Sequence, residues 1–504
     1  MSVPKEIDEK DSSLYGVQEH EVGTQVTPAA QPLDKTEGEW TGFDRKLILK
    51  LDLLLIPLVT TVYLLAFLDR ANVGNARVAG LQTDLGLTDN QYQTAITVTY
   101  VPYIAAEIPS NLIIKKITPR IYIPLLCFCW GVICTLQCLI HNYAGLLACR
   151  FFLGLAEGGI FPGIVLYLSG FYRRHDLSLR IAMFWSAASL SGAFSGLLAA
   201  AISKMDGVGG MRGWKWIFCL EGLFTISWAI LVYILLPNDP HGVRTFTPDE
   251  ATRCVERLKL DVDLLAEEKV TTKKVLSVFT DLHLILIWII AICSGCIIFG
   301  LAYFAPSIVR DMGYSPIRTQ LMSVPPYGFA FVLSLGVAYY SDKYAVRGVP
   351  MILTLVLSLI GIILFYVGRS TPIRYTGLFF LLGGIYANGP CLIAWIPNNT
   401  AGHTRRATAI AVNCICNNTG GIISTWIYPK SDAPYYLFAA KFILSLNCIA
   451  FVATGAAMWV FSRANKKKED PEYRQKLLGD MGDLSFAQQL DRLGDHHPDY
   501  KYIM

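Results

Sequence analysis

Residues 281–305, DLHLILIWIIAICSGCIIFGLAYFA, form an almost unbroken apolar run. After Asp281 the run contains no Asp, Glu, Lys or Arg. Its length is sufficient for one helix across the hydrocarbon core of a bilayer, which takes about 20 residues. Because a helix satisfies its own backbone hydrogen bonds, it can cross lipid without exposing unpaired polar groups. The run therefore predicts a transmembrane helix.

Composition extends this prediction to the whole chain. Over 504 residues the apolar fraction is 53% and the charged fraction 16%, and the mean hydropathy is +0.43. Soluble chains carry about 25% charged residues, so the deficit indicates a surface that faces lipid and disfavours a soluble enzyme. The net charge of +4 is too small to indicate a nucleic-acid partner.

Twelve apolar runs of span length follow one another along the chain. They predict an all-α polytopic membrane protein with twelve transmembrane helices in two six-helix bundles. The eighth run is the weakest because Pro325 and Pro326 interrupt it. The runs cover residues 50–70, 92–112, 121–140, 146–168, 181–202, 214–236, 281–305, 319–340, 349–368, 374–396, 407–428 and 437–461.

Polar segments divide the chain into five expected parts. Charged helical character is expected in the central loop, around Pro248 to Lys259. The parts are a disordered N-terminal tail (1–45), a first bundle (46–236), a central loop (237–280), a second bundle (281–461) and a C-terminal tail (462–504).

The longer polar segments decide the expected orientation, because Lys and Arg in the short loops are balanced between the two sides. Arg45, Lys46, Lys50, the central loop and the basic residues after Arg463 all fall on one side. The positive-inside rule then places both termini and the central loop in the cytoplasm. The plasma membrane is the expected location, with an endomembrane left open.

The two halves resemble each other weakly. Gly158-Gly159-Ile160-Phe161 recurs as Gly383-Gly384-Ile385-Tyr386, a shift of 225 residues. Arg180 before the fifth run and Arg406 before the eleventh differ by 226. Such near-equal shifts are typical of a duplicated six-helix unit.

Ionisable groups inside a span are costly and therefore mark candidate functional sites. Arg150 and Glu157 in the fourth run are seven residues apart, so they share one helix face about two turns apart. In the functional interpretation, Glu157 takes up a proton in the low-dielectric interior. In the alternative, the two residues only hold the bundle together through an ion pair or hydrogen bond.

The first run ends in a second polar group of side chains, with Asp69 and Arg70 followed by Asn72. A guanidinium forms two parallel hydrogen bonds with a carboxylate, which makes Arg70 a candidate for binding an organic anion. The alternative is an interfacial Arg paired with Asp69. Glu107 and Glu221, in the second and sixth runs, are interpreted as structural partners of cations on other helices.

The second half offers polar but uncharged candidates for the same cavity. Each alone is typical of helix packing, whereas a set that faces one cavity would be a site. The candidates for substrate binding are Tyr303, Tyr386, Asn388, Asn413 and Asn417.

Several chemistries lack their motifs. No GxxxxGK[ST] run is present, which argues against an ATP-driven pump, and no HExxH or zinc-ligand spacing appears. Cys293 and Cys296 form a CxxC inside an apolar run without ligand partners, so no metal and no cofactor is expected.

Three motifs in order resemble one known family. They are Leu68-Asp69-Arg70-Ala71-Asn72-Val73-Gly74-Asn75-Ala76, Arg150-Phe151-Phe152-Leu153-Gly154-Leu155-Ala156-Glu157-Gly158-Gly159 and Asn398-Asn399-Thr400-Ala401-Gly402-His403-Thr404-Arg405-Arg406. Together they are similar to the fungal anion:cation symporters, the allantoate-permease-like branch of the major facilitator superfamily, from about Phe43 to Trp459. The segment Asp495 to Tyr502 is similar to that of nicotinate-permease-like members.

The resemblance implies proton-driven uptake of a small organic anion such as nicotinate, pantothenate, biotin or allantoate. In related animal anion transporters, the residues that match Arg70, Arg150 and Glu157 bear on anion binding and proton coupling. Some of those relatives carry a second acidic residue at the position of Leu153, so a two-carboxylate relay does not transfer. The loop with Asp342 and Arg347 keeps the superfamily's acidic and basic pattern, which implies a gating latch there.

The sequence thus leads to the hypothesis of a monomeric proton:organic-anion symporter that works by alternating access in a lipid bilayer. Arg70, Asn72 and Arg150 are expected to bind substrate with the polar residues of the second half, and Glu157 to couple the proton. A uniporter or a proton-antiport exporter on the same fold is the alternative. A membrane sensor or a membrane-embedded enzyme is disfavoured, since no signalling domain and no nucleophile constellation is recognisable. The sequence leaves the substrate's identity open.

Overall fold

The computed structural model describes residues 42–262, 271–479, 489 and 492–504. The chain divides into two compact units after Lys46. Of the first unit, the structure describes residues 42–46, which begin helix α1. Residues 1–41 of the predicted N-terminal tail and residues 263–270 of the predicted central loop lie outside the described residues.

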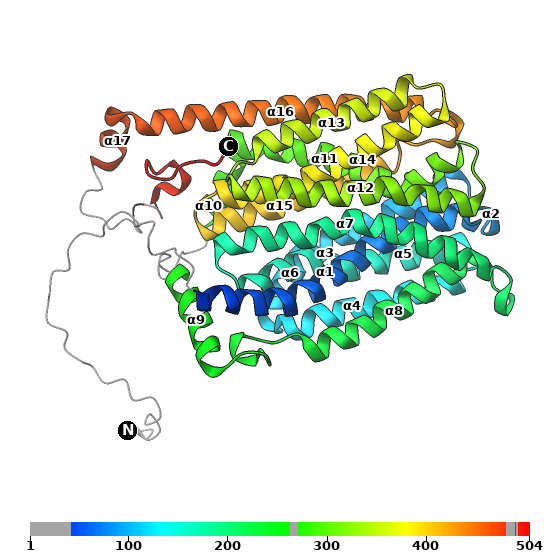
Figure 1. Cartoon of the computed structure of the whole chain (residues 1–504), viewed down its shortest axis with the longest axis horizontal. Helices are drawn as coiled ribbons and strands as arrows, with labels where there is room; N and C mark the ends of the chain where they lie inside the picture. The colour runs from blue at the N-terminus through cyan, green and yellow to red at the C-terminus, as the bar shows by residue number, and fades with distance from the viewer. Residues whose placement is uncertain (1–41, 263–270, 480–488, 490–491) are drawn as a thin grey trace, which may run out of the picture. The chain divides into compact units, whose positions relative to one another are not determined.

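Eleven of the twelve predicted spans coincide with one long helix and the fourth with two, and the fold class is confirmed as all-α (Figure 1). In the described part of the chain, ten helices are long and apolar enough to cross a membrane. The second and eleventh predicted spans, α3 and α15, are not among these ten, although they contain 28 and 22 residues. Pro325 and Pro326 do not break the helix of the eighth span, and α12 runs through both.

The helices have the following bounds: α1 Gly42–Val78, α2 Leu81–Asp84, α3 Asp89–Lys116, α4 Pro119–Leu136, α5 Tyr143–Glu157, α6 Ile160–Ser169, α7 Arg174–Ile202, α8 Gly213–Leu235, α9 Pro248–Val262, α10 Thr272–Ser277, α11 Leu282–Arg310, α12 Pro316–Lys343, α13 Gly348–Val367, α14 Thr371–Asn399, α15 His403–Ser424, α16 Leu437–Glu469 and α17 Pro471–Leu478.

The fourth span differs from its prediction as one continuous helix. It is divided into α5 and α6 at Gly158 and Gly159. Pro162 lacks the N–H that would bond to the carbonyl of Gly158, so the regular ladder is interrupted there. The break places Glu157 at the last position of α5.

The two glycine pairs of the internal repeat occupy matching crossings. A Cβ at Gly158 would meet the backbone carbonyl of Tyr103 in α3, the second span, and a Cβ at Gly383 would meet Phe329 in α12, the eighth span. A glycine at such a crossing lets two helices approach to backbone distance. The shared contacts agree with a duplicated six-helix unit.

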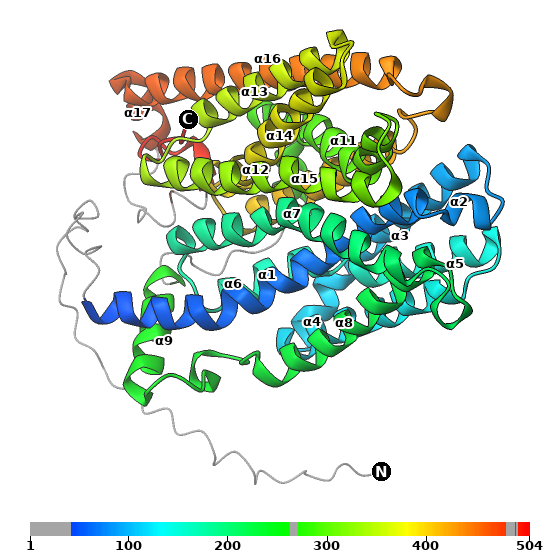
Figure 2. The same cartoon turned by 45° about the vertical axis from the view of Figure 1, so that its right-hand side comes forward.

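Neighbouring helices pack within each half. In the second half, α13 and α14 pack side by side, and α16 packs against α11 and α13 (Figures 1 and 2). In the first half, α4 packs against α8, and α3 against α5. The halves meet mainly where α7 packs against α12 and α14 and where α3 packs against α15.

The C-terminal segment folds onto one end of the second half. We define the tail face as the end of the helices where α11 and α15 begin and α14 and α16 end. Ile503 pairs with Asn399 through two hydrogen bonds of 2.7 and 2.9 Å, and its carbonyl accepts a third from Trp395 at 2.9 Å. The segment Gly494 to Met504, drawn in red in Figure 1, therefore belongs to the folded structure of the tail face.

Asp495 is the electrostatic centre of this docking. Its carboxylate is fully buried and pairs with Arg405, the guanidinium of which also pairs with Asp281. The hydroxyl of Tyr502 donates to Asp495 at 2.8 Å. Burial beside that carboxylate raises the pKa of Tyr502, so the hydroxyl stays a donor.

We predict that Asp495→Ala destabilises the protein, because removing one partner leaves the Arg405 guanidinium with less compensation in a buried site, at a cost of about 3 kcal/mol. Asp499→Ala is the matched control, since Asp499 pairs with Arg474 while 48% exposed and such surface pairs contribute about 0–1 kcal/mol. The measurement is the thermal unfolding midpoint of each purified variant. Equal midpoints for the two variants would contradict the docking.

Candidate functional site

A cavity lies between the two halves, about midway along the helices and extending toward the tail face. A volume of about 70 Å³ is open in it to the centre of a water molecule. One water needs about 10–15 Å³ in this measure, so the cavity has room for roughly five waters or for a small organic molecule. The polar residues in its lining are Arg70, Glu107, Glu157, Ser294, Asn413, Asn417 and Asn418, and the aromatic ones are Tyr63, Phe67, Tyr103, Phe161, Trp185 and Phe299.

Arg70 is the one basic residue among the described residues that line the cavity. Its guanidinium lies over three aromatic rings, at 5.1 Å from the ring centres of Phe67 and Phe299 and 5.0 Å from that of Tyr103. The negative faces of the rings compensate a cation that water does not solvate. Phe67 comes from α1, Tyr103 from α3 and Phe299 from α11, so both halves hold this charge.

Glu157 is the nearest carboxylate to this cation. Its Oε2 lies 3.5 Å from Nη2 of Arg70, and the side chain is 1% exposed. This is a loose pair, because neither oxygen of Glu157 has a hydrogen-bond partner in the described structure. A carboxylate that shares a cation without hydrogen bonds can be displaced by a competing anion at low cost.

The wall that faces Arg70 and Glu157 comes from the second half. Asn413, Asn417 and Asn418 of α15 reach the cavity. The Oδ1 of Asn413 has no hydrogen-bond partner among the described residues, while the amide of Asn418 donates to the backbone carbonyl of Cys414 at 2.9 Å. Polar groups on α15 explain why this helix is less apolar than the other predicted spans.

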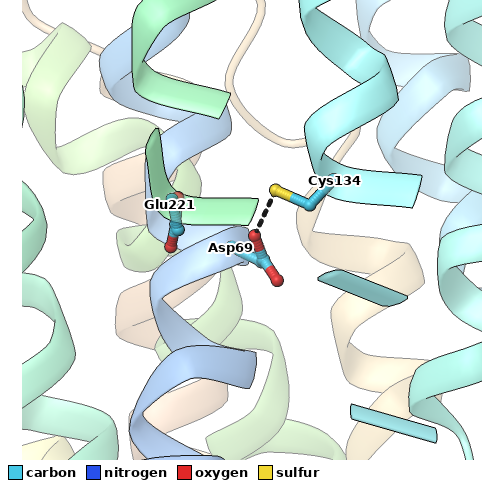
Figure 3. A group of neighbouring side chains, drawn as sticks. All are labelled: Asp69, Cys134 and Glu221. Carbon is cyan, nitrogen blue, oxygen red and sulfur yellow. Dashed lines mark hydrogen bonds between the residues drawn. The ribbon is translucent and has the colours of Figure 1, made fainter. Parts of the chain in front are cut away.

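A buried polar cluster lies behind the Arg70 side of the cavity, among α1, α4 and α8 (Figure 3). The Cys134 thiol donates to Asp69 at 2.9 Å, and Asn72 donates to Glu221. The ligand atoms of Asp69, Cys134 and Glu221 lie within 4.8 Å of one another. Because Asp69 and Glu221 already accept hydrogen bonds from the chain, we interpret the cluster as an internal hydrogen-bond network.

Four of the predicted site residues come together in the cavity lining: Arg70, Glu157, Asn413 and Asn417. The other predicted substrate-binding residues lie outside that lining in this conformation, and no finding tests their roles. Arg150 lies 5.5 Å from the Phe218 ring, and Asn72 accepts from Ser195 at 2.7 Å.

The remaining three predicted residues are packed within the second half or against the first. Tyr303 lies edge-on to Tyr100 at 6.4 Å between ring centres. Tyr386 packs on Tyr327 at 5.8 Å, and the Asn388 amide donates to Ser294 at 3.3 Å. Asn388 thus contacts a lining residue without lining the cavity itself.

The predicted gating residues lie at the tail face. Asp342 and Arg347 form an ion pair between α12 and α13, and Arg347 donates to the Ser341 hydroxyl at 2.8 Å. Their side chains hold the loop that joins these two helices.

The halves are in close contact at the ends of the helices away from the tail face. Thr97 and Thr425 share a hydrogen bond of 2.7 Å, and Ser203 donates to Gln320 at 3.1 Å. A Cβ at Gly74 would collide with the backbone carbonyl of Tyr303. The cavity is therefore closed on the side opposite to the tail face.

Sequence reasoning missed the aromatic group and Glu107 as lining residues. Phe67, Tyr103 and Phe299 carry no special spacing, and aromatic residues are common in apolar helices. Glu107 was singled out by its charge but interpreted as structural. Only the assembled helices show that these side chains face the same cavity as Arg70.

We predict that Gly158→Ala lowers stability, because its Cβ would meet the Tyr103 carbonyl and push α3 away from α5. Gly455→Ala in α16 is the matched control. A Cβ there meets nothing within 4 Å, and Ala in place of a helical Gly stabilises by roughly 0.5–1 kcal/mol. The thermal unfolding midpoints of both variants test this, and a Gly158→Ala variant as stable as the control would refute the close crossing.

Comparisons with known proteins place this geometry in context. A family model described as Major Facilitator Superfamily matches residues 59–425. An uncharacterised transporter of Schizosaccharomyces pombe is 32% identical over 428 residues, covering 85% of this chain and 88% of that protein. A high-affinity nicotinic acid transporter of Saccharomyces cerevisiae is 31% identical over 464 residues, covering 91% of this chain and 85% of that protein.

A solved structure supports the fold independently. The proton:xylose symporter XylE, bound to 6-bromo-6-deoxy-D-glucose, superimposes with a TM-score of 0.65 at 15% identity. The match covers 81% of this chain and 96% of that structure. At such low identity the likeness shows a shared fold alone.

Proposed function

The chain belongs to the major facilitator superfamily of multi-pass membrane transporters, and we propose that it imports a small organic monocarboxylate together with a proton. Membership makes the chain a transporter rather than an enzyme, since its named relatives are transporters. The substrate, the coupling ion and the direction are parts of the proposal.

The single observation that carries the proposal is Arg70 in the cavity. A lone guanidinium in a mostly apolar, aromatic-lined cavity selects an anion. Its planar fork fits a carboxylate, and the surrounding rings offer faces on which a flat ring can stack. A planar aromatic carboxylate such as nicotinate satisfies both features, and the similarity to a nicotinic acid transporter supports this choice.

Competition for Arg70 provides the coupling. An ionised Glu157 occupies Arg70 at 3.5 Å and would repel an incoming carboxylate. A proton on Glu157 removes that repulsion and frees the guanidinium for the substrate. Substrate and proton then favour each other's binding, which is the thermodynamic requirement for symport.

The charge balance of the interior supports proton uptake. The carboxyl groups of Asp69, Glu157 and Glu221 interact electrostatically with the guanidinium groups of Arg70 and Arg150. Glu107 of the cavity wall is a fourth buried carboxyl group, so with all of these groups ionised four negative charges face two positive ones. The excess negative charge is costly in an apolar interior, and each bound proton reduces it.

The way the halves meet supports alternating access. The halves are in contact at the ends of the helices away from the tail face, and the cavity extends toward the tail face. If the tail face is cytoplasmic, as the basic residues after Arg463 imply, this conformation is inward-facing. In our proposal, residues 46–236 and 281–461 rock as two bundles, and the Asp342–Arg347 pair serves as the latch of the second bundle. We place the transporter in the plasma membrane as a monomer.

We predict that Arg70→Lys weakens substrate binding by about 1.5–3 kcal/mol, which raises the KM for nicotinate about 10- to 100-fold, because Lys lacks the bidentate fork. The measurement is uptake of labelled nicotinate by cells that lack their own carrier. Arg212→Lys is the control, since Arg212 is 67% exposed. An unchanged KM in Arg70→Lys would remove Arg70 from the binding site.

We predict that Glu157→Gln binds and exchanges substrate but does not accumulate it against a gradient, because Gln mimics the protonated state permanently. Wild-type uptake should rise as the external pH falls, whereas uptake by Glu157→Gln should be independent of pH. Glu469→Gln, at an exposed side chain, is the control. Normal accumulation by Glu157→Gln would refute its role, and substrate efflux driven by inward protons would support an exporter instead.

A further inference from the structure

Glu107 is a buried carboxyl group in the cavity wall that the proposed coupling does not use. Glu107 lies in α3, is 2% exposed and lines the same cavity as Arg70. Its Oε2 has no hydrogen-bond partner in the described structure. A buried polar atom without a partner is costly, so a ligand that supplies a partner binds more tightly.

The backbone of α3 sets the spacing between Glu107 and Arg70. The Arg70 guanidinium lies over the ring of Tyr103, at 5.0 Å from its centre. Tyr103 and Glu107 are four residues apart on one helix face, which corresponds to a rise of about 6 Å. Glu107 therefore lies about one helical turn along α3 from the residue that contacts Arg70, in the direction of the tail face.

The cavity wall opposite Glu107 belongs to the second half of the chain. Cys414 of α15 lines the same cavity as Glu107 of α3. Asn413 and Asn417 on the same helix as Cys414 line it as well. A thiol is a weak donor, so a polar substrate atom between α3 and α15 would give Glu107 a stronger partner.

We infer that Glu107 is a second recognition group, which pairs with a polar atom of the substrate other than its carboxylate. This inference rests on the proposed function, in which Arg70 binds the carboxylate. It narrows the substrate class to small carboxylates with a second polar atom, either an N–H or O–H that donates to an ionised Glu107 or a ring nitrogen that accepts from a protonated Glu107. Carboxylates of the same shape without that polar atom leave Glu107 unpaired and bind more weakly.

Nicotinate and benzoate form the matched pair that tests this inference. They share a six-membered ring and a carboxylate and differ by a ring nitrogen in place of a C–H group. Dissociation constants for both are measured with purified full-length protein by isothermal titration calorimetry. The variants are Glu107→Leu, which removes the polar group, and Glu107→Gln, which keeps hydrogen-bonding capacity.

The expected result is a change in selectivity rather than in overall affinity. Wild-type protein should prefer nicotinate about tenfold, the equivalent of one hydrogen bond. In Glu107→Leu, the ratio of the benzoate to the nicotinate dissociation constant should fall to about one. The dissociation constant for benzoate should change less than about threefold. Glu107→Gln should retain part of the preference.

Three outcomes would overturn the inference. A Glu107→Leu variant that binds both ligands more weakly by the same factor would show that Glu107 has a structural role. An unchanged ratio, with altered pH dependence of uptake, would show that Glu107 carries a proton instead. If wild-type protein binds neither carboxylate, both the proposed function and this inference fail. This outcome differs from the first two because it is seen in the wild-type protein, without any variant.

Discussion

A charge in the apolar interior of a membrane must find its compensation within the chain, and the rest of this structure depends on how Arg70 does so. Three aromatic rings from three helices surround its guanidinium, and Glu157 supplies a loose counter-charge. The rings come from both halves of the chain. The position of one cation thereby links the packing of the helices to the binding of an anion.

Close helix crossings make this arrangement possible. Gly154 and Gly158 let α5 approach the backbone of α3 so closely that a Cβ at either position would meet a carbonyl group. This contact places Glu157 and Tyr103 on the same side of the cavity. At the ends of the helices away from the tail face, Gly74 brings α1 against α11 in the same way. Small residues thus determine both the shape of the site and the side on which it is closed.

The tail face is organised by different forces. Hydrogen bonds and ion pairs around Asp495, Arg405 and Asn399 hold it together, and Tyr502 packs there on Phe461. The polar C-terminal tail predicted from the sequence is therefore in part a folded element, and a search for apolar runs does not detect it. The contacts tie the ends of α14, α15 and α16 together, which makes the second half stiff at the face toward which the cavity extends.

The sequence by itself determined the class of the protein and the order of its helices, because backbone hydrogen bonds and lipid impose a run of about 20 apolar residues on each span. It also identified Arg70 and Glu157, since ionisable groups in such runs stand out. Only the tertiary structure decided which groups share a cavity. It brought Glu107 and the aromatic rings beside Arg70 and left Arg150 and Asn72 outside the lining. The physical reason is that side-chain direction depends on helix rotation, on the break at Gly158 and on crossings between distant segments, none of which is encoded in a local pattern.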